Sequence, residues 1–263
     1  MTTYVRWAEA GWRGWIEPAV AREAASWLAA AASGAGRASR HARTLRVAGP
    51  AGVAWVKSYP PPGARRARRA FAMGRALAAA GFGAPTALLM ATRRGAGILV
   101  TREVGGEDLL AAAAHAAPGA RRRLLRALGA EVGRLHAAGF VHGDLVPANV
   151  RVHGGRFVFL DHDRTRRSRI LVRLAGRRNL VQLGRFVVSG VTVVDRARVL
   201  DAYARQRGLR RRARRRLARW VVAKTIARRC AIDAIAPAVA MRAGFAALMR
   251  SGGPFDPAAR RAT

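Results

Sequence analysis

The sequence predicts an α+β fold with two lobes: a small strand-rich N-terminal lobe over residues 1–104 and a larger helical C-terminal lobe over residues 105–263. Three observations lead to this prediction. Short alternating apolar runs, bounded by glycine and proline, fill much of the first part of the chain. Gly105-Gly106 then offers a hinge. The segments after this hinge carry apolar residues at helical spacing.

The N-terminal lobe is expected to contain a helix, a strand pair, a second helix and two further strands. These elements are predicted, in order, over residues 1–35, 41–49 with 53–59, 64–81, and 87–106. An alanine-rich run that ends at the breaker SGAG indicates the first helix, and Gly81 ends the second. The segment PPPG ends the strand that contains Lys57.

The C-terminal lobe is predicted to be mainly helical, with one hairpin near its start. Apolar residues recur at helical spacing over residues 120–138 and again over about 179–248. Between these stretches, the segment VRVHGGRFVF predicts a β-hairpin. Gly154-Gly155 can adopt the positive φ angles that a two-residue turn needs.

The composition implies an anionic partner. The chain has 49 Lys and Arg residues against 14 Asp and Glu, a formal charge of +35. Nucleic acid, an anionic membrane surface or an acidic substrate would each match that charge. Only Lys57 and Lys224 of the basic residues are lysine, and this bias towards arginine indicates that part of the charge is solvated surface set by genome composition. The single cysteine, Cys230, excludes an internal disulfide and a zinc site built of cysteines.

The segment FVHGDLVPANVRVHGGRFVFLDHD concentrates polar residues that could perform phosphoryl transfer. Pairing outward from the Gly-Gly turn places Asn149 and Asp161 at the open end of the hairpin, about 5 Å apart. Together with His142 and Asp144, this spacing matches the phosphoryl-transfer template of kinases. His142 and Asp144 are the predicted catalytic residues, and Asn149 and Asp161 the predicted magnesium ligands. The alternative is a turn and hairpin with incidental polar residues.

A phosphate-binding lysine is expected upstream, at Lys57. Strand alternation in GVAWVKSY places Lys57 on one face with Val53 and Trp55. A compact ammonium on this strand suits contact with the nucleotide phosphates. Glu103 and Val104, immediately before the hinge, are also predicted to bind the cofactor.

The sequence departs from the kinase template in several places. Gly143 stands where protein kinases have an arginine, and no glycine follows the DHD segment at residues 161–163. The helix after Lys57 contains no acidic residue that could pair with this lysine, so any acidic partner must come from elsewhere. The glycine-rich loop is best matched by residues 33–45, although no strict template fits.

The chain resembles the lipopolysaccharide core kinases, a family that includes Kdo kinases and heptose kinases and is similar to protein kinases in fold. The resemblance covers about residues 43–203. It is carried by VAWVKSYPPP, ALAAAGFGAPTALLMATRR, VTREVGGEDL, LHAAGFVHGDLVPANVRV, FLDHDRTRR and RRNLVQLGRFV. The resemblance implies a two-lobed protein-kinase-like fold and a kinase that uses ATP and Mg²⁺. The implied acceptor is a sugar hydroxyl of Kdo–lipid A or the inner core.

The arginines that follow the DHD segment are expected to bind an anionic acceptor, because guanidinium groups pair with carboxylates and phosphates. These arginines are Arg164, Arg166, Arg167 and Arg169. A basic helix over residues 205–219 could lie on anionic lipid headgroups, and Trp7, Trp12 and Trp15 could be interfacial anchors or core residues. The expected location is cytoplasmic and peripheral on the inner membrane, since no secretory signal or spanning segment is predicted.

Two other functions are compatible with parts of the sequence. An aminoglycoside- or choline-type phosphotransferase would share the H-G-D…N…D residues, but its cationic acceptors would favour an acidic pocket. A basic module that binds nucleic acid would not require Lys57, Asp144, Asn149 and Asp161 together, and base-stacking aromatic residues are absent from the arginine runs. The oligomeric state is not predicted.

Overall fold

The computed structural model describes residues 2–258, which form two compact units. The first unit comprises Met1–Gly105 and Val158–Thr165, and the second comprises Gly106–Phe157 and Arg166–Thr263. The sequence analysis placed residues 158–165 in the C-terminal lobe, whereas their contacts group them with the first unit. The backbone N–H of Phe159 donates a hydrogen bond to the carbonyl oxygen of Gly83 at 2.9 Å, which ties this segment to the first unit.

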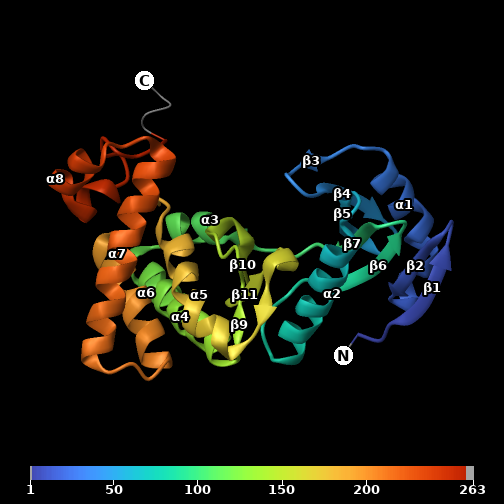
Figure 1. Cartoon of the computed structure of the whole chain (residues 1–263), viewed down its shortest axis with the longest axis horizontal. Helices are drawn as coiled ribbons and strands as arrows, with labels where there is room; N and C mark the ends of the chain where they lie inside the picture. The colour runs from blue at the N-terminus through green and yellow to red at the C-terminus, as the bar shows by residue number, and fades with distance from the viewer. Residues whose placement is uncertain (1, 259–263) are drawn as a thin grey trace. The chain divides into compact units, whose positions relative to one another are not determined.

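The first unit contains a seven-stranded antiparallel sheet in the order β1-β2-β6-β7-β5-β4-β3 (Figure 1). Its strands are β1 (Val5–Glu9), β2 (Trp12–Ile16), β3 (Arg37–Ala38), β4 (Arg43–Gly49), β5 (Gly52–Tyr59), β6 (Ala87–Arg93) and β7 (Ala96–Arg102). The short 3₁₀ helices η1 (Pro18–Glu23) and η3 (His162–Arg164), and the helices α1 (Ala24–Ala32) and α2 (Ala64–Ala79), complete this unit. The predicted strand pair, the helix after it and the two later strands are confirmed.

The two helices cover opposite faces of this sheet. Trp27 of α1 packs in one core cluster with Val56 and Ile98, whereas Phe71 of α2 packs in another with Tyr59. Side chains alternate along a strand, so Lys57 lies on the same face of β5 as Tyr59. This alternation directs Lys57 to the face of the sheet that α2 covers.

The prediction of a helix from the start of the chain is wrong for residues 5–16, which form a β-hairpin. Ala10 and Gly11 make its turn, with φ angles of 49° and 79°. Strand β2 continues the main sheet by pairing with β6. A Cβ atom on Gly14 would lie 1.8 Å from the carbonyl oxygen of Met90, so only glycine permits this close approach. The alternative that the early tryptophans pack inside the unit is supported, because Trp7 and Trp12 contact its core.

The second unit is mainly helical, as the sequence predicts. Its helices are α3 (Leu109–His115), α4 (Pro118–Ala137), α5 (Arg169–Gly184), α6 (Val193–Gln206), α7 (Arg211–Asp233) and α8 (Pro237–Leu248), with the 3₁₀ helix η2 (Pro147–Asn149). Its strands are β8 (Glu107–Asp108), β9 (Phe140–Val141), β10 (Val150–His153), the first part of β11 (Arg156–Phe159) and β12 (Arg166–Arg167). The two-residue turn between β10 and β11 is confirmed, since Gly154 and Gly155 have φ angles of 55° and 73°.

Small residues bring α4 and α6 close together. A Cβ atom on Gly129 would lie 2.2 Å from the carbonyl oxygen of Val199, and one on Gly133 would lie 2.7 Å from the Gln206 side chain. This approach buries the C-terminal part of α4, which leads into β9 and the loop that carries Asp144 (Figure 1). Among residues 2–258, no helix has the length and apolar character needed to cross a membrane.

Candidate active site

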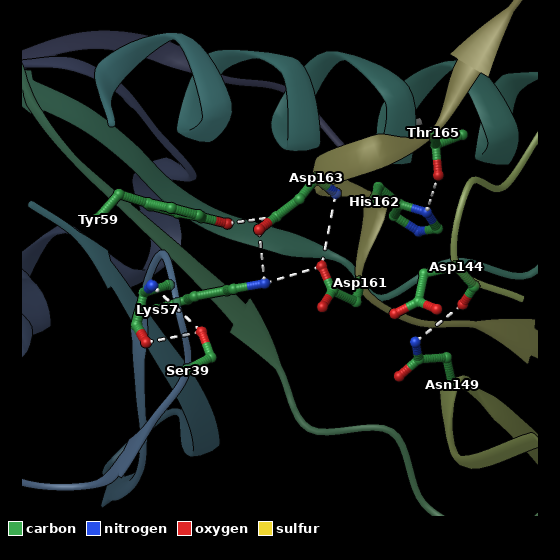
Figure 2. Close-up of polar contacts among 10 residues, drawn as sticks. Ser39, Lys57, Tyr59, Asp144, Asn149, Asp161, His162, Asp163 and Thr165 are labelled. Atoms are coloured by element: carbon green, nitrogen blue, oxygen red, sulfur yellow. Dashed lines mark hydrogen bonds and ion pairs between the residues drawn. The ribbon is translucent and has the colours of Figure 1, made fainter. Parts of the chain in front are cut away.

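In the first unit, Lys57 forms ion pairs with two carboxylates. Its Nζ lies 2.8 Å from Oδ1 of Asp161 and 2.9 Å from Oδ2 of Asp163 (Figure 2). The hydroxyl of Tyr59 donates a hydrogen bond to Oδ1 of Asp163 at 2.6 Å. Asp163 therefore binds two side chains from the same face of β5. It supplies an acidic partner for Lys57, which the sequence analysis did not find in the helix after this lysine.

Within this cluster, Lys57 and Asp161 stabilise the charged forms of each other. Burial acts to lower the pKa of Lys57, but attraction by Asp161 and Asp163 outweighs it, and the pKa is raised. Burial likewise acts to raise the pKa of Asp161, yet the nearby ammonium holds it below its usual value. The pKa of Asp163 is raised, because burial and the charge of Asp161 together outweigh the attraction of Lys57. The pKa of Tyr59 is raised as well, mainly by burial, so its hydroxyl stays protonated and donates to Asp163.

The two aspartates differ in accessibility. The side chain of Asp161 is 40 % exposed, whereas that of Asp163 is 12 % exposed and is held by Tyr59. Asp161 can therefore reach a ligand from solvent while Asp163 is committed to neighbouring side chains. This difference favours Asp161 for a metal or phosphate contact and Asp163 for orienting Lys57.

The backbone of Asp161 adopts an uncommon conformation. Its φ and ψ angles are 58° and 78°, in the left-handed region that residues other than glycine rarely occupy. Such conformations cost of order 1–3 kcal/mol and concentrate at functional sites. Residues Asp163 and Tyr59 were not identified from the sequence. The spacing of two aspartates around His162, and the shared face of Lys57 and Tyr59, are the signals that could have revealed them.

In the second unit, Asp144 lies in the loop after β9. Nδ2 of Asn149 donates a hydrogen bond to the backbone carbonyl of Asp144 at 3.0 Å, and the backbone N–H of Val146 donates to the same oxygen at 2.9 Å (Figure 2). Because its NH₂ group is engaged, Asn149 has its amide oxygen as the atom that could bind a cation. His142 is only 1 % exposed, and its direct part in catalysis stays a prediction.

One basic side chain, that of Arg185, interacts electrostatically with Asp144. Burial lowers the pKa of Arg185, at the end of α5; repulsion by Arg228 of α7 lowers it further, whereas the charge of Asp144 opposes the shift. Asp144 and both arginines belong to the second unit. Arg185 therefore contributes positive charge near Asp144, which suits an anionic ligand.

The four arginines predicted to bind the acceptor are exposed, but they do not form one group. Arg164 ends η3 in the first unit, whereas the other three belong to the second. Arg166 and Arg167 form β12, which pairs with the strand that leads directly to the Asp144 loop. The guanidinium of Arg167 also lies 5.1 Å from the centroid of the Phe140 ring. Arg169 begins α5.

The remaining predicted nucleotide contacts have clear positions in the first unit. The carboxylate of Glu103 pairs with Arg46 at 2.7 Å and 2.9 Å, and its backbone N–H donates to Val53. If Glu103 and Val104 contact a nucleotide, the backbone is the better candidate, because the Glu103 side chain is engaged. The expected glycine-rich segment forms the hairpin of β3 and β4, whose turn is closed by hydrogen bonds between Ser39 and Ala42.

The oxygen ligands predicted for magnesium are of the right chemical type. Among the described residues, no group of three or more His, Cys, Asp and Glu side chains could hold a metal ion by itself. Magnesium in nucleotide sites is typically held by one or two protein oxygens together with phosphate oxygens and water. The exposed Asp161 carboxylate and the Asn149 amide oxygen fit that role. They belong to different units, so the shared cation site stays a prediction.

A family model matches the part of the chain that contains these residues. The model for the lipopolysaccharide kinase (Kdo/WaaP) family matches residues 55–203, which is more than half of the chain. The chain belongs to this family. The matched region contains Lys57, Asp144, Asn149 and Asp161, and it confirms the resemblance seen in the sequence. Membership implies ATP as the phosphoryl donor, usually with a divalent metal.

The fold agrees with this assignment. The crystal structure of an aminoglycoside-3'-phosphotransferase of type VIII matches with a TM-score of 0.51 and 16 % sequence identity, covering 72 % of this chain and 90 % of that one. At this identity the match shows the fold alone, and it confirms the predicted kinase-like α+β fold. Family and fold together make this Kdo/WaaP kinase a phosphotransferase that acts on hydroxyl groups.

Two curated relatives match over shorter stretches. Both are described as a probable bifunctional tRNA threonylcarbamoyladenosine biosynthesis protein. The protein from Methanothermobacter thermautotrophicus is 35 % identical over 83 residues, and the one from Natronomonas pharaonis is 39 % identical over 79 residues. The matches cover 32 % and 30 % of this chain but only 14 % of each relative. The chain thus spans about one seventh of the length of these relatives.

Proposed function

We propose that this kinase transfers the γ-phosphoryl group of ATP to a sugar hydroxyl in the Kdo or inner-core region of lipopolysaccharide, at the cytoplasmic face of the inner membrane. The match to the Kdo/WaaP family over residues 55–203 carries the proposal. The paired carboxylates on Lys57 and the hydrogen-bonded Asp144 loop support the catalytic assignments.

In this proposal, residues of the first unit bind the nucleotide. Lys57 would contact the phosphates, and Asp161 would hold Mg²⁺ together with Asn149 of the second unit. Bound Mg²⁺ would neutralise charge on the transferred phosphoryl group. Asp163, fixed by Tyr59, would keep the Lys57 ammonium aimed at the phosphates while Asp161 binds the metal. It would perform the task that a glutamate on the following helix performs in protein kinases.

Asp144 would orient the acceptor hydroxyl and accept its proton. The acceptor oxygen would form the new bond to phosphorus as the bond to the ADP oxygen breaks. General base assistance of this kind contributes roughly 10²–10⁴-fold to the rate.

The acceptor would be recognised through its negative charge. Arg166 and Arg167 pair with β9, the strand that precedes the Asp144 loop, and Arg185 interacts electrostatically with Asp144. A Kdo carboxylate or a lipid A phosphate would pair with guanidinium groups of this kind. An aminoglycoside is cationic, and these same arginines would repel it, so the lipopolysaccharide acceptor is favoured over the aminoglycoside alternative.

Contact with the membrane would involve α7. Arg211, Arg212, Arg215 and Arg216 are exposed near the start of this helix. Arg214 differs from them, because its guanidinium binds the carbonyl of Leu209 and the carboxylate of Asp201. The four exposed arginines are the residues proposed to contact anionic headgroups. Each would contribute about 1 kcal/mol to the free energy of membrane binding.

One assay tests the substrate class directly. The purified chain is incubated with labelled ATP and Mg²⁺ against Kdo–lipid A, inner-core heptose acceptors and aminoglycosides. Transfer to one of the anionic glycolipids is expected, and Lys57→Ala should abolish it. Transfer to aminoglycosides alone would overturn the proposed acceptor while leaving the kinase assignment intact.

A further inference from the structure

The side chain of Gln182, on α5, forms hydrogen bonds to the backbone of the residues immediately before and after Asp144. Its Oε1 accepts a hydrogen bond from the backbone N–H of Leu145 at 3.1 Å, and its Nε2 donates to the carbonyl of Gly143 at 3.1 Å. One planar amide therefore binds the backbone on both sides of Asp144. We propose that Gln182 is a positioning residue that fixes Asp144 in the geometry required for catalysis. This inference rests on the proposed function, in which Asp144 is the base.

Asn179 forms hydrogen bonds to the Gln182 side chain and to the backbone of the same loop. One turn earlier on α5, it is 1 % exposed, and its Nδ2 donates to Oε1 of Gln182 at 2.8 Å. Its Oδ1 accepts the backbone N–H of His142 at 3.2 Å and contacts Nε2 of His136 at 3.1 Å. The backbone N–H of His142 can only donate, which identifies the amide oxygen and leaves the NH₂ group for Gln182. The two α5 amides therefore contact the loop at three backbone atoms.

His136 and Tyr203 anchor this network in two further helices. Nδ1 of His136, on α4, lies 2.9 Å from the hydroxyl of Tyr203, on α6. Because Oδ1 of Asn179 accepts, Nε2 of His136 carries the ring proton and Nδ1 accepts from Tyr203. Burial lowers the pKa of His136 to about 4, so the ring is neutral near pH 7 and keeps this polarity. The order of donors then runs from Tyr203 through His136, Asn179 and Gln182 to Gly143.

The loop needs such a restraint because of its own sequence. Gly143 immediately precedes Asp144 and has a φ angle of 78°, a conformation that glycine adopts without cost but does not enforce. Protein kinases have an arginine at this position. In this chain the amides of α5 supply fixed contacts instead. A displacement of about 1 Å at a reacting group can cost roughly 10²-fold in rate, so this restraint has a direct effect on turnover.

The test compares Gln182→Glu and Gln182→Leu with Gln206→Glu. Glutamate keeps the size of Gln182 but replaces the Nε2 donor by an oxygen that repels the Gly143 carbonyl. Gln206 is an exposed amide at the end of α6, and its substitution makes the same charge change outside the network. In both Gln182 variants kcat should fall about 10²-fold with KM for ATP nearly unchanged, because the nucleotide contacts are not altered.

The split between kcat and KM, measured where each variant is fully folded, separates positioning from general destabilisation. In folded Gln182→Glu, kcat should fall while KM for ATP stays near the parent value. Gln206→Glu should leave both kcat and KM unchanged. Circular dichroism and thermal unfolding establish whether each variant is folded. If Gln182→Leu does not fold, the comparison is made with Gln182→Glu alone.

Asp144→Asn distinguishes the two proposals. If Asp144→Asn is inactive but folded Gln182→Glu retains kcat within twofold of the parent, the positioning proposal is overturned and the proposed function stands. If Asp144→Asn retains normal turnover, Asp144 is not the base and both proposals are overturned.

Discussion

Lys57 and Asp163 are joined by a 2.9 Å ion pair, although they are distant in the sequence. The Asp163 carboxylate also accepts the Tyr59 hydroxyl, and Tyr59 lies two residues after Lys57 on the same face of β5. The carboxylate of Asp163 therefore contacts both Lys57 and its neighbour Tyr59 on the same face of β5. If Asp161 binds a metal as proposed, Asp163 would remain as the acidic partner of Lys57.

Asp163→Asn should impair the use of ATP without abolishing it. The amide removes the negative charge that orients Lys57, and hydrogen bonds to charged groups are worth about 1.5–3 kcal/mol. We expect KM for ATP to rise roughly tenfold or more, with the Mg²⁺ dependence of turnover retained. Tyr59→Phe should have a smaller effect in the same direction. Steady-state kinetics with ATP and Mg²⁺ varied separately would measure both, and an unchanged KM in Asp163→Asn would contradict the assigned role.

Asp161→Asn should abolish turnover while preserving the fold. A neutral amide holds a cation weakly, so the charge of the triphosphate would go uncompensated. Asparagine tolerates the left-handed backbone of this position, where φ is 58°, so the variant should remain folded. Asp163→Asn is the control for this variant, because each substitution removes one negative charge that pairs with Lys57. Near-normal turnover of folded Asp161→Asn would show that the metal ligand is wrongly assigned.

The two arginine groups should have separable functions. Alanine at Arg164, Arg166, Arg167 and Arg169 should raise KM for the acceptor much more than KM for ATP. This effect should weaken as salt rises, because exposed charges are screened over about 8 Å at physiological ionic strength.

Alanine at Arg211, Arg212, Arg215 and Arg216 removes the same number of charges and is the matched variant. It should reduce sedimentation with anionic vesicles and leave activity on detergent-dispersed acceptor largely unchanged. If both four-arginine variants behave alike in kinetics and sedimentation, the arginines act only through net charge, and neither surface has the specific role proposed for it.

The free energy of unfolding should fall with acidification because of His136. Its pKa is lowered to about 4 by burial, against about 6.5 in an unfolded chain. Between pH 6.5 and pH 4, His136 therefore binds a proton in the unfolded chain but not in the folded one. The free energy of unfolding is highest above pH 6.5 and falls as the pH is lowered towards 4. The full loss amounts to roughly 3 kcal/mol.

Urea unfolding of the parent and of His136→Gln at pH 7 and pH 5 measures this contribution. The difference in stability between the two pH values should be smaller in the variant. Equal pH dependence in both proteins would show that His136 is not the group responsible.

Much of the fold could be predicted because its causes are local. Gly154-Gly155 produces the predicted primed turn, and the alternation around Lys57 correctly assigns its strand and face. The residues of the H-G-D…N…D segment identify phosphoryl transfer because their chemical types and spacing are restrictive. The N-terminal hairpin was missed because its strands are short and its stability depends on pairing with β6, where Gly14 meets the backbone of Met90.

The sequence by itself therefore determined the family of this protein and its class of reaction, phosphoryl transfer to a hydroxyl group. It also predicted which lysine, aspartates and amide act in that reaction. Only the tertiary structure decided how the side chains are held. Alternation places Lys57 on a face but does not say that Asp163 will meet it, and helical spacing does not reveal that Gln182 brackets Asp144. Such partners are set by packing between segments far apart in the chain, and side-chain hydrogen bonds depend on distances that no local pattern encodes.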